Sequence, residues 1–183
     1  TGISVIGNVV DGALDTGIQG YSWSDSTVAN NIIKNAGSQA IRFTSTVDNT
    51  TKRLTITGNV CTEFGINGIF MDGTASQVFT NCVVSNNTLE SSVSTGSGIA
   101  LEFFNNSVCN GNSVKDVSQH GIFVQTCNDT VVNGNNIQQA DLSGIAVNAG
   151  TRNSVTANRI YEVGNRGIWL SAATTKNMIS GNT

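Results

Sequence analysis

The chain has 183 residues, of which 38% are hydrophobic and only 11% are charged, with 20 glycines and no proline. This hydrophobic content and a net charge of −3 favour a folded chain over a disordered one. The nine Lys and Arg residues are scattered, which argues against nucleic acid as a partner. No apolar run approaches the roughly 18 residues that a membrane span needs.

One short phrase recurs along the chain: an apolar residue, any residue, a small residue, Asn, any residue, and an apolar residue. Successive Asn positions are 23, 28, 28, 25, 23, 23 and 24 residues apart. Such a period is typical of stacked repeats, and the phrase predicts a short strand on each side of its Asn. In chain order these residues are Asn8, Asn31, Asn59, Asn87, Asn112, Asn135, Asn158 and Asn182.

A second phrase follows the Asn by nine residues, or by eleven in the fourth copy, and reads small residue, Ile, variable residue, large apolar residue. Its alternation predicts a third short strand in each repeat. The copies begin at Gly17, Ala40, Gly68, Gly98, Gly121, Gly144 and Gly167. No repeat can bury its apolar face alone, so we expect the repeats to stack, with each Asn hydrogen-bonded to the turn of the next coil.

These repeats resemble those of right-handed parallel β-helices, the family that includes pectate lyases, polygalacturonases, mannuronan C-5 epimerases and phage tailspike depolymerases. The resemblance covers the whole chain. It implies an all-β, single-stranded right-handed parallel β-helix of seven coils and part of an eighth, with three sheets and an internal Asn ladder. It also implies an extracellular or virion-surface location. The activity is not determined by it, because the same repeat carries several chemistries.

We expect residues 1–183 to form a single β-helix domain that is a fragment or core of a longer chain. Bare end coils would expose sheet edges, so either a homotrimer or flanking domains would cover them. The interior positions of Cys61 and Cys109, and the unrelated positions of Cys82 and Cys127, predict free buried thiols. We expect no cofactor and no metal site, since no Cys or His spacing is that of a metal site.

Two residues of each Gly-Ile strand should point outward. The residue after the strand forms a column that places Asp72 and Glu102 on adjacent coils, with backbones about 5 Å apart. Two such carboxylates can supply an acid beside a base, as glycosidic cleavage requires. The alternative is that both are solvated and point apart. The whole column is expected to read Ser22, Thr44, Asp72, Glu102, Gln125, Asn148 and Ser171.

The other outward column contains Phe70, Phe123 and Trp169, whose rings suit the apolar faces of sugars or a neighbouring subunit. Longer connections at 43–56, 71–84 and 90–97 should build walls beside the carboxylates.

Basic side chains near the first long connection, Arg42 and Arg53, could meet an acidic sugar. The single histidine, His120, lies in Gln119-His120-Gly121, which resembles part of the Gly-His-Gly of polygalacturonases. The Asn-Thr-Asp and Asp-Asp phrases of that family are missing.

These features predict an extracellular polysaccharide-processing β-helix, a lyase or glycoside hydrolase of possible tailspike type. Asp72 and Glu102 are the expected catalytic residues, and Arg42, Arg53, Phe70, His120, Phe123 and Trp169 the expected substrate-binding residues. Two alternatives stay open: a non-catalytic carbohydrate-binding or adhesin segment, and a purely structural spacer. A convergent set of titratable groups would favour the enzyme.

Overall fold

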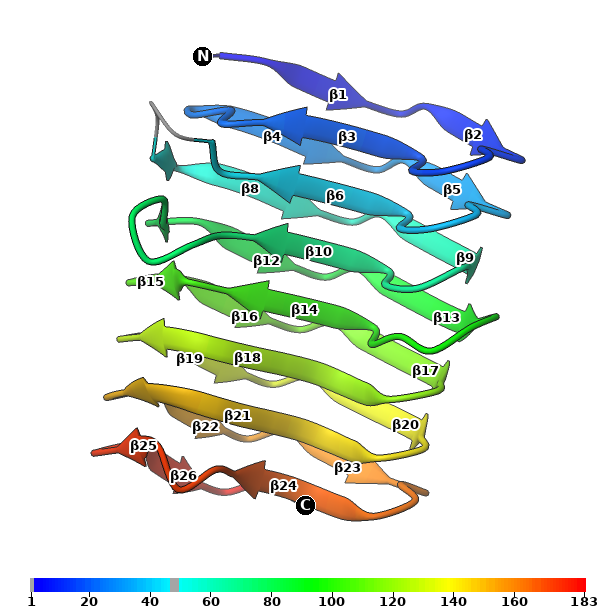
Figure 1. The fold of residues 1–183 in the computed structure, drawn as a ribbon. Coiled ribbons are helices and arrows are strands. Elements are labelled where there is room, and N and C mark those ends of the chain that lie inside the picture. The colour runs from blue at the N-terminus through cyan, green and yellow to red at the C-terminus, as the bar shows by residue number, and fades with distance from the viewer. Residues whose placement is uncertain (1, 47–49) are drawn as a thin grey trace.

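The computed structural model describes residues 2–46 and 50–183. In these two segments the chain forms strands and no helix, so no helix is long and apolar enough to cross a membrane. The strands wind coil upon coil along one axis, with the N-terminal coil at the top of Figure 1 and the C-terminal coil at the bottom. Neighbouring coils pair in parallel throughout, which confirms the right-handed parallel β-helix expected from the repeats.

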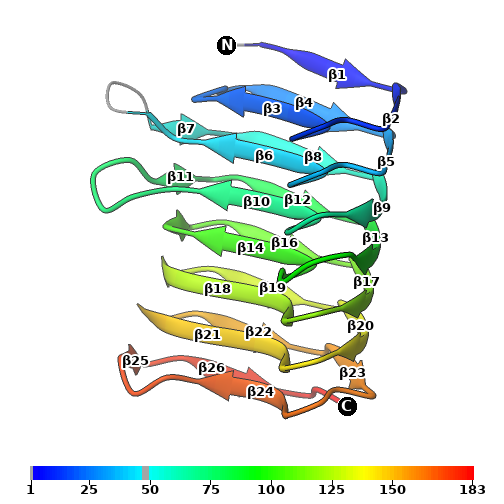
Figure 2. The same cartoon turned by 45° about the vertical axis from the view of Figure 1, so that its right-hand side comes forward.

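Three sheets run along the rod, and Figure 2 shows them side by side. Sheet 1 contains β1 (Ser4–Ile6), β4 (Ser26–Ala29), β8 (Leu54–Thr57), β12 (Val83–Ser85), β16 (Val108–Asn110), β19 (Val131–Asn133), β22 (Ser154–Thr156) and β26 (Met178–Ser180). Sheet 2 contains β2 (Val9–Asp11), β5 (Ile32–Lys34), β9 (Val60–Phe64), β13 (Thr88–Ser92), β17 (Ser113–Val117), β20 (Asn136–Ala140) and β23 (Arg159–Tyr161). Sheet 3 carries the Gly-Ile strands β3 (Ile18–Tyr21), β6 (Ile41–Thr44), β10 (Ile69–Asp72), β14 (Ile99–Glu102), β18 (His120–Asn128), β21 (Ser143–Thr151) and β24 (Arg166–Leu170).

A fourth, short sheet was not predicted. It contains β7 (Thr51–Lys52), β11 (Phe79–Thr80) and β15 (Phe104–Asn105), while β25 (Thr174–Thr175) pairs with the end of β21. The inward Phe79 and Phe104 are fully buried and extend the common core into this corner. Strands of two residues are too short for an alternation to appear in the sequence.

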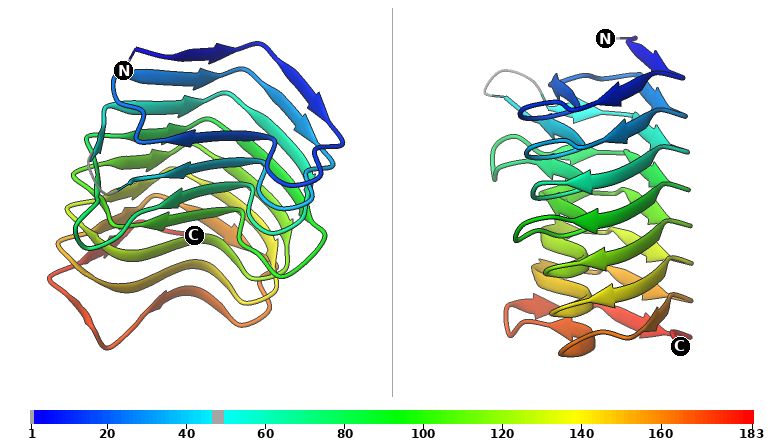
Figure 3. Two further views of the ribbon diagram at one scale, coloured as in Figure 1. Left: turned by 45° about the horizontal axis from the view of Figure 1, so that its top comes forward. Right: turned by 90° about the vertical axis from the view of Figure 1, so that its right-hand side faces the viewer.

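The coils bend at single residues with positive φ, and Figure 3 shows the resulting corners. One such corner lies directly before each interior Asn and explains the small residue of the repeated phrase. Glycine reaches positive φ without steric cost, and Asn tolerates it better than most residues. The residues at this corner are Gly7, Asn30, Gly58, Asn86, Gly111, Gly134, Ala157 and Gly181.

The interior Asn residues form the expected ladder. At Asn112, Oδ1 accepts hydrogen bonds from the backbone N and Nδ2 of Asn87, both at 3.0 Å. Its Nδ2 donates to Asn135 Oδ1 at 2.9 Å and to the Val84 carbonyl at 3.1 Å. The same pattern repeats from coil to coil, so polar groups at a buried turn are paired without water.

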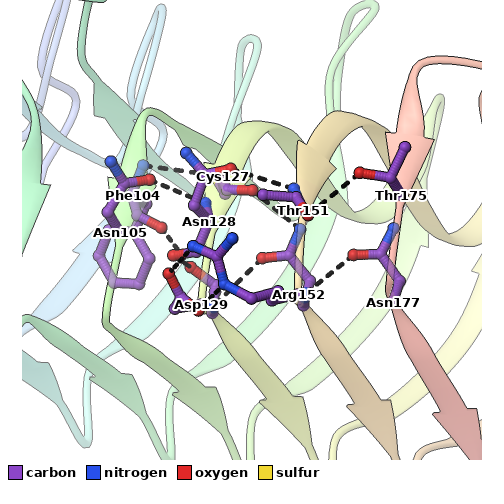
Figure 4. Close-up of polar contacts among 11 residues, drawn as sticks. Phe104, Asn105, Cys127, Asn128, Asp129, Thr151, Arg152, Thr175 and Asn177 are labelled. Atoms are coloured by element: carbon purple, nitrogen blue, oxygen red, sulfur yellow. Dashed lines mark hydrogen bonds and ion pairs between the residues drawn. The ribbon is translucent and has the colours of Figure 1, made fainter.

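A second ladder, shown in Figure 4, joins the ends of β15, β18 and β21. Asn105 Oδ1 accepts a hydrogen bond from the backbone N–H of Asn128, and Asn128 Oδ1 accepts one from the backbone N–H of Thr151. At the adjacent corner, Arg152 donates two hydrogen bonds to the carboxylate of Asp129. Such coil-to-coil bonds hold equivalent residues in register along the rod.

The core is a set of columns of equivalent side chains. The Ile column of sheet 3 is buried from Ile18 to Ile145. All four cysteines are buried and free, as expected. Burial raises the pKa of Cys61, Cys109 and Cys127 to about 12, so these thiols are protonated at neutral pH.

Candidate functional site

The two carboxylates expected at the site end neighbouring strands of sheet 3. Strands β10 and β14 pair in parallel, with Phe70 opposite Ala100 and Met71 opposite Leu101. The next position on each strand is Asp72 and Glu102, so the pair lies on adjacent coils. Alternation turns Met71 and Leu101 into the core and both carboxylates outward, where they are half-buried.

Asp72 is held by the coil that precedes it. Arg42 Nη2 lies 2.6 Å from Asp72 Oδ2, and Thr44 Oγ1 donates to the same oxygen at 3.3 Å. The two side chains of this ion pair are only 33% and 23% exposed. Both contacts are made to Oδ2, and within the described residues Oδ1 accepts no hydrogen bond.

Glu102 is in a different environment from Asp72. Burial raises the pKa of Glu102 above its ordinary value, and the negative charge of Asp72 raises it further. Across residues 2–46 and 50–183, no hydrogen bond or ion pair engages the Glu102 carboxylate. The site therefore joins an ion-paired carboxylate to an unpaired one whose pKa is raised.

A protruding connection borders the carboxylates. Residues 73–78 leave β10 at Asp72 and loop outward before β11, and the loop is visible beside sheet 3 in Figure 2. Thr74 and Gln77 close it with two backbone hydrogen bonds. Gly73 packs so closely on the Glu102 carbonyl that a Cβ there would lie 2.6 Å from the oxygen. Of the earlier long connection, residues 47–49 lie outside the described residues.

The other outward column of sheet 3 forms a floor beside the carboxylates. In register, Phe70, Ala100, Phe123, Ala146 and Trp169 follow one another on successive coils; we call them the apolar strip. Ala100 and Ala146 alternate with the three aromatic residues and are 5% and 0% exposed. The strip covers four strand spacings, about 19 Å.

Two of the three rings have neighbours on their faces. Arg42 lies over Phe70, with Cζ 5.6 Å from the ring centroid. His120 stacks on Phe123 with centroids 5.3 Å apart. Trp169 has no such ring contact within the described residues.

Two sequence predictions are placed elsewhere by the structure. Arg53 lies at the corner between β7 and β8, where its guanidinium donates twice to Asp25. The first coil contributes Tyr21, opposite Thr44, to the carboxylate column, so the assignment of Ser22 was wrong. Gly20 holds the inward position there, opposite Phe43, and the ring of Phe43 occupies the space that a larger side chain would fill. The first coil therefore lacks the large apolar residue that marks this position in the other repeats.

His120 begins β18 and lies on the far side of the apolar strip from the carboxylate column. Gln125, not His120, is opposite Glu102, so the histidine is five positions along β18 from that column. Burial lowers the pKa of His120, and its Nδ1 is buried without a hydrogen-bond partner. His120 therefore cannot share a proton with Glu102.

Sequence reasoning missed the ion pair of Arg42 with Asp72 and the partnership with Thr44. The signal was present in the repeat alignment, since Thr44 is opposite Asp72 on the preceding coil and Arg42 is opposite Phe70. No group of three or more His, Cys, Asp or Glu side chains that could hold a metal ion occurs in the part of the chain that the structure describes.

The chain is similar in structure to several solved β-helices. A mutant of the periplasmic alginate epimerase AlgG matches with a TM-score of 0.68 and 14% identity, over 92% of this chain and 47% of that chain. The Azotobacter vinelandii mannuronan C-5 epimerase AlgE6 A-module also matches with a TM-score of 0.68 and 14% identity, over 97% of this chain and 56% of that chain. The Dettilon tailspike protein matches with a TM-score of 0.61 and 16% identity, over 99% of this chain and 42% of that chain. The chain thus spans about half the length of these proteins, and at such identities the similarity establishes the fold alone.

Sequence comparison gives a family. No curated protein sequence matches the chain. Residues 49–183 match the family described as periplasmic copper-binding protein (NosD). Because this match covers well over half of the sequence and the fold agrees with it, the chain belongs to the NosD family of parallel β-helix proteins.

Proposed function

We propose that this β-helix processes a polysaccharide by hydrolysing a glycosidic bond on the outer face of sheet 3, with Glu102 as general acid and Asp72 as nucleophile. The observation that carries the proposal is the contrast between the two neighbouring carboxylates. Asp72 is ion-paired with Arg42, whereas Glu102 is half-buried and unpaired. Environments that separate two carboxylates in this way are typical of an acid and its partner.

The strand spacing favours a retaining mechanism. Adjacent strands lie about 4.8 Å apart, close to the roughly 5–5.5 Å between the carboxyl groups of retaining glycosidases. Asp72 Oδ1 would attack the anomeric carbon as the glycosidic C–O bond breaks and Glu102 donates its proton to the leaving oxygen. Water, deprotonated by the Glu102 carboxylate, would then hydrolyse the glycosyl ester and release Asp72.

Arg42 and Thr44 have a positioning role in this proposal. Both hold Asp72 by Oδ2, which leaves Oδ1 directed to substrate. The apolar strip beside the pair would bind the apolar faces of sugar rings, and the loop at residues 73–78 would shield the pair from water.

The test compares Glu102→Gln and Asp72→Asn with a matched control, Glu90→Gln. Glu90 is a surface glutamate of sheet 2, ion-paired with Lys115. With release of reducing ends from a panel of polysaccharides as the assay, we expect both site variants to lose about 10²-fold or more, and the control to keep its activity. Unchanged turnover by Glu102→Gln would remove it from the site.

A second assay isolates the acid. An aryl glycoside with a good leaving group needs no proton to depart, so Glu102→Gln should keep the first step on that substrate while Asp72→Asn loses it. If the two variants lose activity on the aryl glycoside to the same extent, the assignment of roles is wrong. Binding of polysaccharide without any turnover would favour the alternative of a non-catalytic carbohydrate-binding protein, for which the apolar strip is the supporting observation.

A location outside the cytoplasm belongs to the same proposal. The family description names periplasmic proteins, and the similar structures include a periplasmic epimerase and a tailspike. The homotrimer or flanking domains expected at the end coils remain a proposal too.

Copper binding, named in the family description, is not extended to this chain. Copper sites in proteins use thiolate, thioether and imidazole ligands gathered at one place. The four thiols and the thioether of Met71 are buried in the core, Met178 lies on β26 in the last coil, and the one imidazole, His120, stacks on Phe123. The residues that the structure describes therefore do not fit a copper site, and no step of the proposed reaction uses one.

A further inference from the structure

The positions of the cationic side chains on the rod restrict the substrate. All nine Lys and Arg residues lie within the described segments. Seven of them are on sheet 2, on β7, or at the corners that directly follow β7, β21 and β25. These are Lys34, Lys52, Arg53, Lys115, Arg152, Arg159 and Lys176.

Only Arg42 and Arg166 lie on sheet 3. Arg42 is engaged by Asp72 and covers the ring of Phe70. Arg166 lies on β24, where it is opposite Ser143 of β21. The strand β24 is three strand spacings, or about 14 Å, from β14, which carries Glu102. Arg166 also lies on the far side of the apolar strip. No unpaired cation in the described chain therefore faces the carboxylate pair.

The remaining surface around the pair is acidic, apolar or uncharged. Asp72 and Glu102 are followed in their column by Gln125, Asn148 and Ser171. A polyuronate would bring a carboxylate on every sugar against this surface. Like charges facing each other across an interface disfavour binding. The one cation beside the pair, Arg42, is already engaged by Asp72.

We infer that the surface formed by the apolar strip and the carboxylate column binds an uncharged polysaccharide. This inference rests on the proposed function and names its substrate class. The strip supplies apolar surface for sugar rings over about 19 Å. Trp169 is the ring of the strip that has no ring or cation contact within the described residues. The uncharged side chains from Gln125 to Ser171 supply hydrogen-bonding groups for hydroxyls along one side.

The experiment uses pairs of polymers that share a sugar configuration and differ at C6, where one carries a carboxylate and the other an uncharged group: polygalacturonate and its full methyl ester, polyglucuronate and soluble β-1,4-glucan, polymannuronate and β-1,4-mannan. Binding of the unmodified protein is measured by calorimetry and affinity electrophoresis. We expect at least one uncharged polymer to bind about ten-fold or more tightly than its anionic counterpart, a difference of about 1.4 kcal/mol. Trp169→Ala should weaken that binding.

A charge variant tests the cause. Gln125→Arg introduces a cation directly opposite Glu102 and should shift preference toward the anionic polymer of the pair. Thr88→Arg adds the same charge to an exposed site on sheet 2 and should leave the preference unchanged.

Equal or tighter binding of the anionic polymers by the unmodified protein would overturn the inference and leave the proposed hydrolase intact. Binding of an uncharged polymer with undiminished cleavage by Glu102→Gln would overturn the catalytic proposal and leave the inference intact. Failure to bind any polymer would overturn both.

Discussion

The internal ladder is most directly tested by replacing Asn112 with Ala at the middle of the rod. The substitution strands the buried backbone N–H of Asn87, whose acceptor is Asn112 Oδ1. It also removes the bond from Asn87 Nδ2 and the two bonds that Asn112 Nδ2 donates to Asn135 and Val84.

The magnitude follows from these four bonds. A stranded buried donor costs about 1–3 kcal/mol and each of the other bonds contributes about 0.5–1.5 kcal/mol, so the free energy of unfolding should fall by about 3–7 kcal/mol. That is a large share of the roughly 5–15 kcal/mol of a typical domain. Urea unfolding followed by circular dichroism should show a midpoint lower by about 1 M or more.

Two controls accompany this measurement. Asn165→Ala changes an exposed Asn outside the ladder and should shift the free energy of unfolding by at most about 0.5 kcal/mol. Asn112→Asp keeps the shape but puts an oxygen opposite the Asn135 and Val84 oxygens, so it should destabilise at least as much as Ala. A loss below about 1 kcal/mol for Asn112→Ala would refute the hydrogen-bond account of the ladder.

Three further outcomes are expected. The pKa of Glu102 is raised in the folded state, so its contribution to stability is present below its unfolded pKa and is lost as pH rises through the folded value. The Glu102→Gln variant should therefore gain stability over the unmodified protein as pH rises above about 4.5. A difference in the free energy of unfolding that does not change with pH would contradict this. Gly121→Ala should destabilise strongly in thermal unfolding, since its Cβ would lie 2.3 Å from Ile137 Cγ2 and 2.7 Å from the Gly144 carbonyl oxygen; an unchanged melting temperature would contradict that packing. The four buried cysteines are Cys61, Cys82, Cys109 and Cys127. A thiol reagent should label none of them in the native protein and all four after unfolding, and rapid labelling of the native protein would contradict their burial.

Much of the geometry of the candidate site could be predicted from the sequence because each coil repeats the same local pattern. Equivalent positions such as Phe70 and Ala100 pair in register, as the alignment of repeats implies. The first coil is the exception, because Gly20 in place of a large apolar residue removed the cue for its alignment. The pairing of Arg42 with Asp72 joins residues 30 positions apart and depends on the direction of two side chains, which spacing does not specify.

The sequence by itself determined the rod, its coils, the inward and outward columns and the Asn ladder, because these follow from a period and an alternation that are written in every repeat. The tertiary structure decided the partners of individual side chains: Asp72 with Arg42, Arg53 with Asp25, His120 with Phe123, and Glu102 with none in the described chain. It also decided the fourth sheet. These features depend on side-chain rotamers and on how far each corner turns, and both are set by packing between coils.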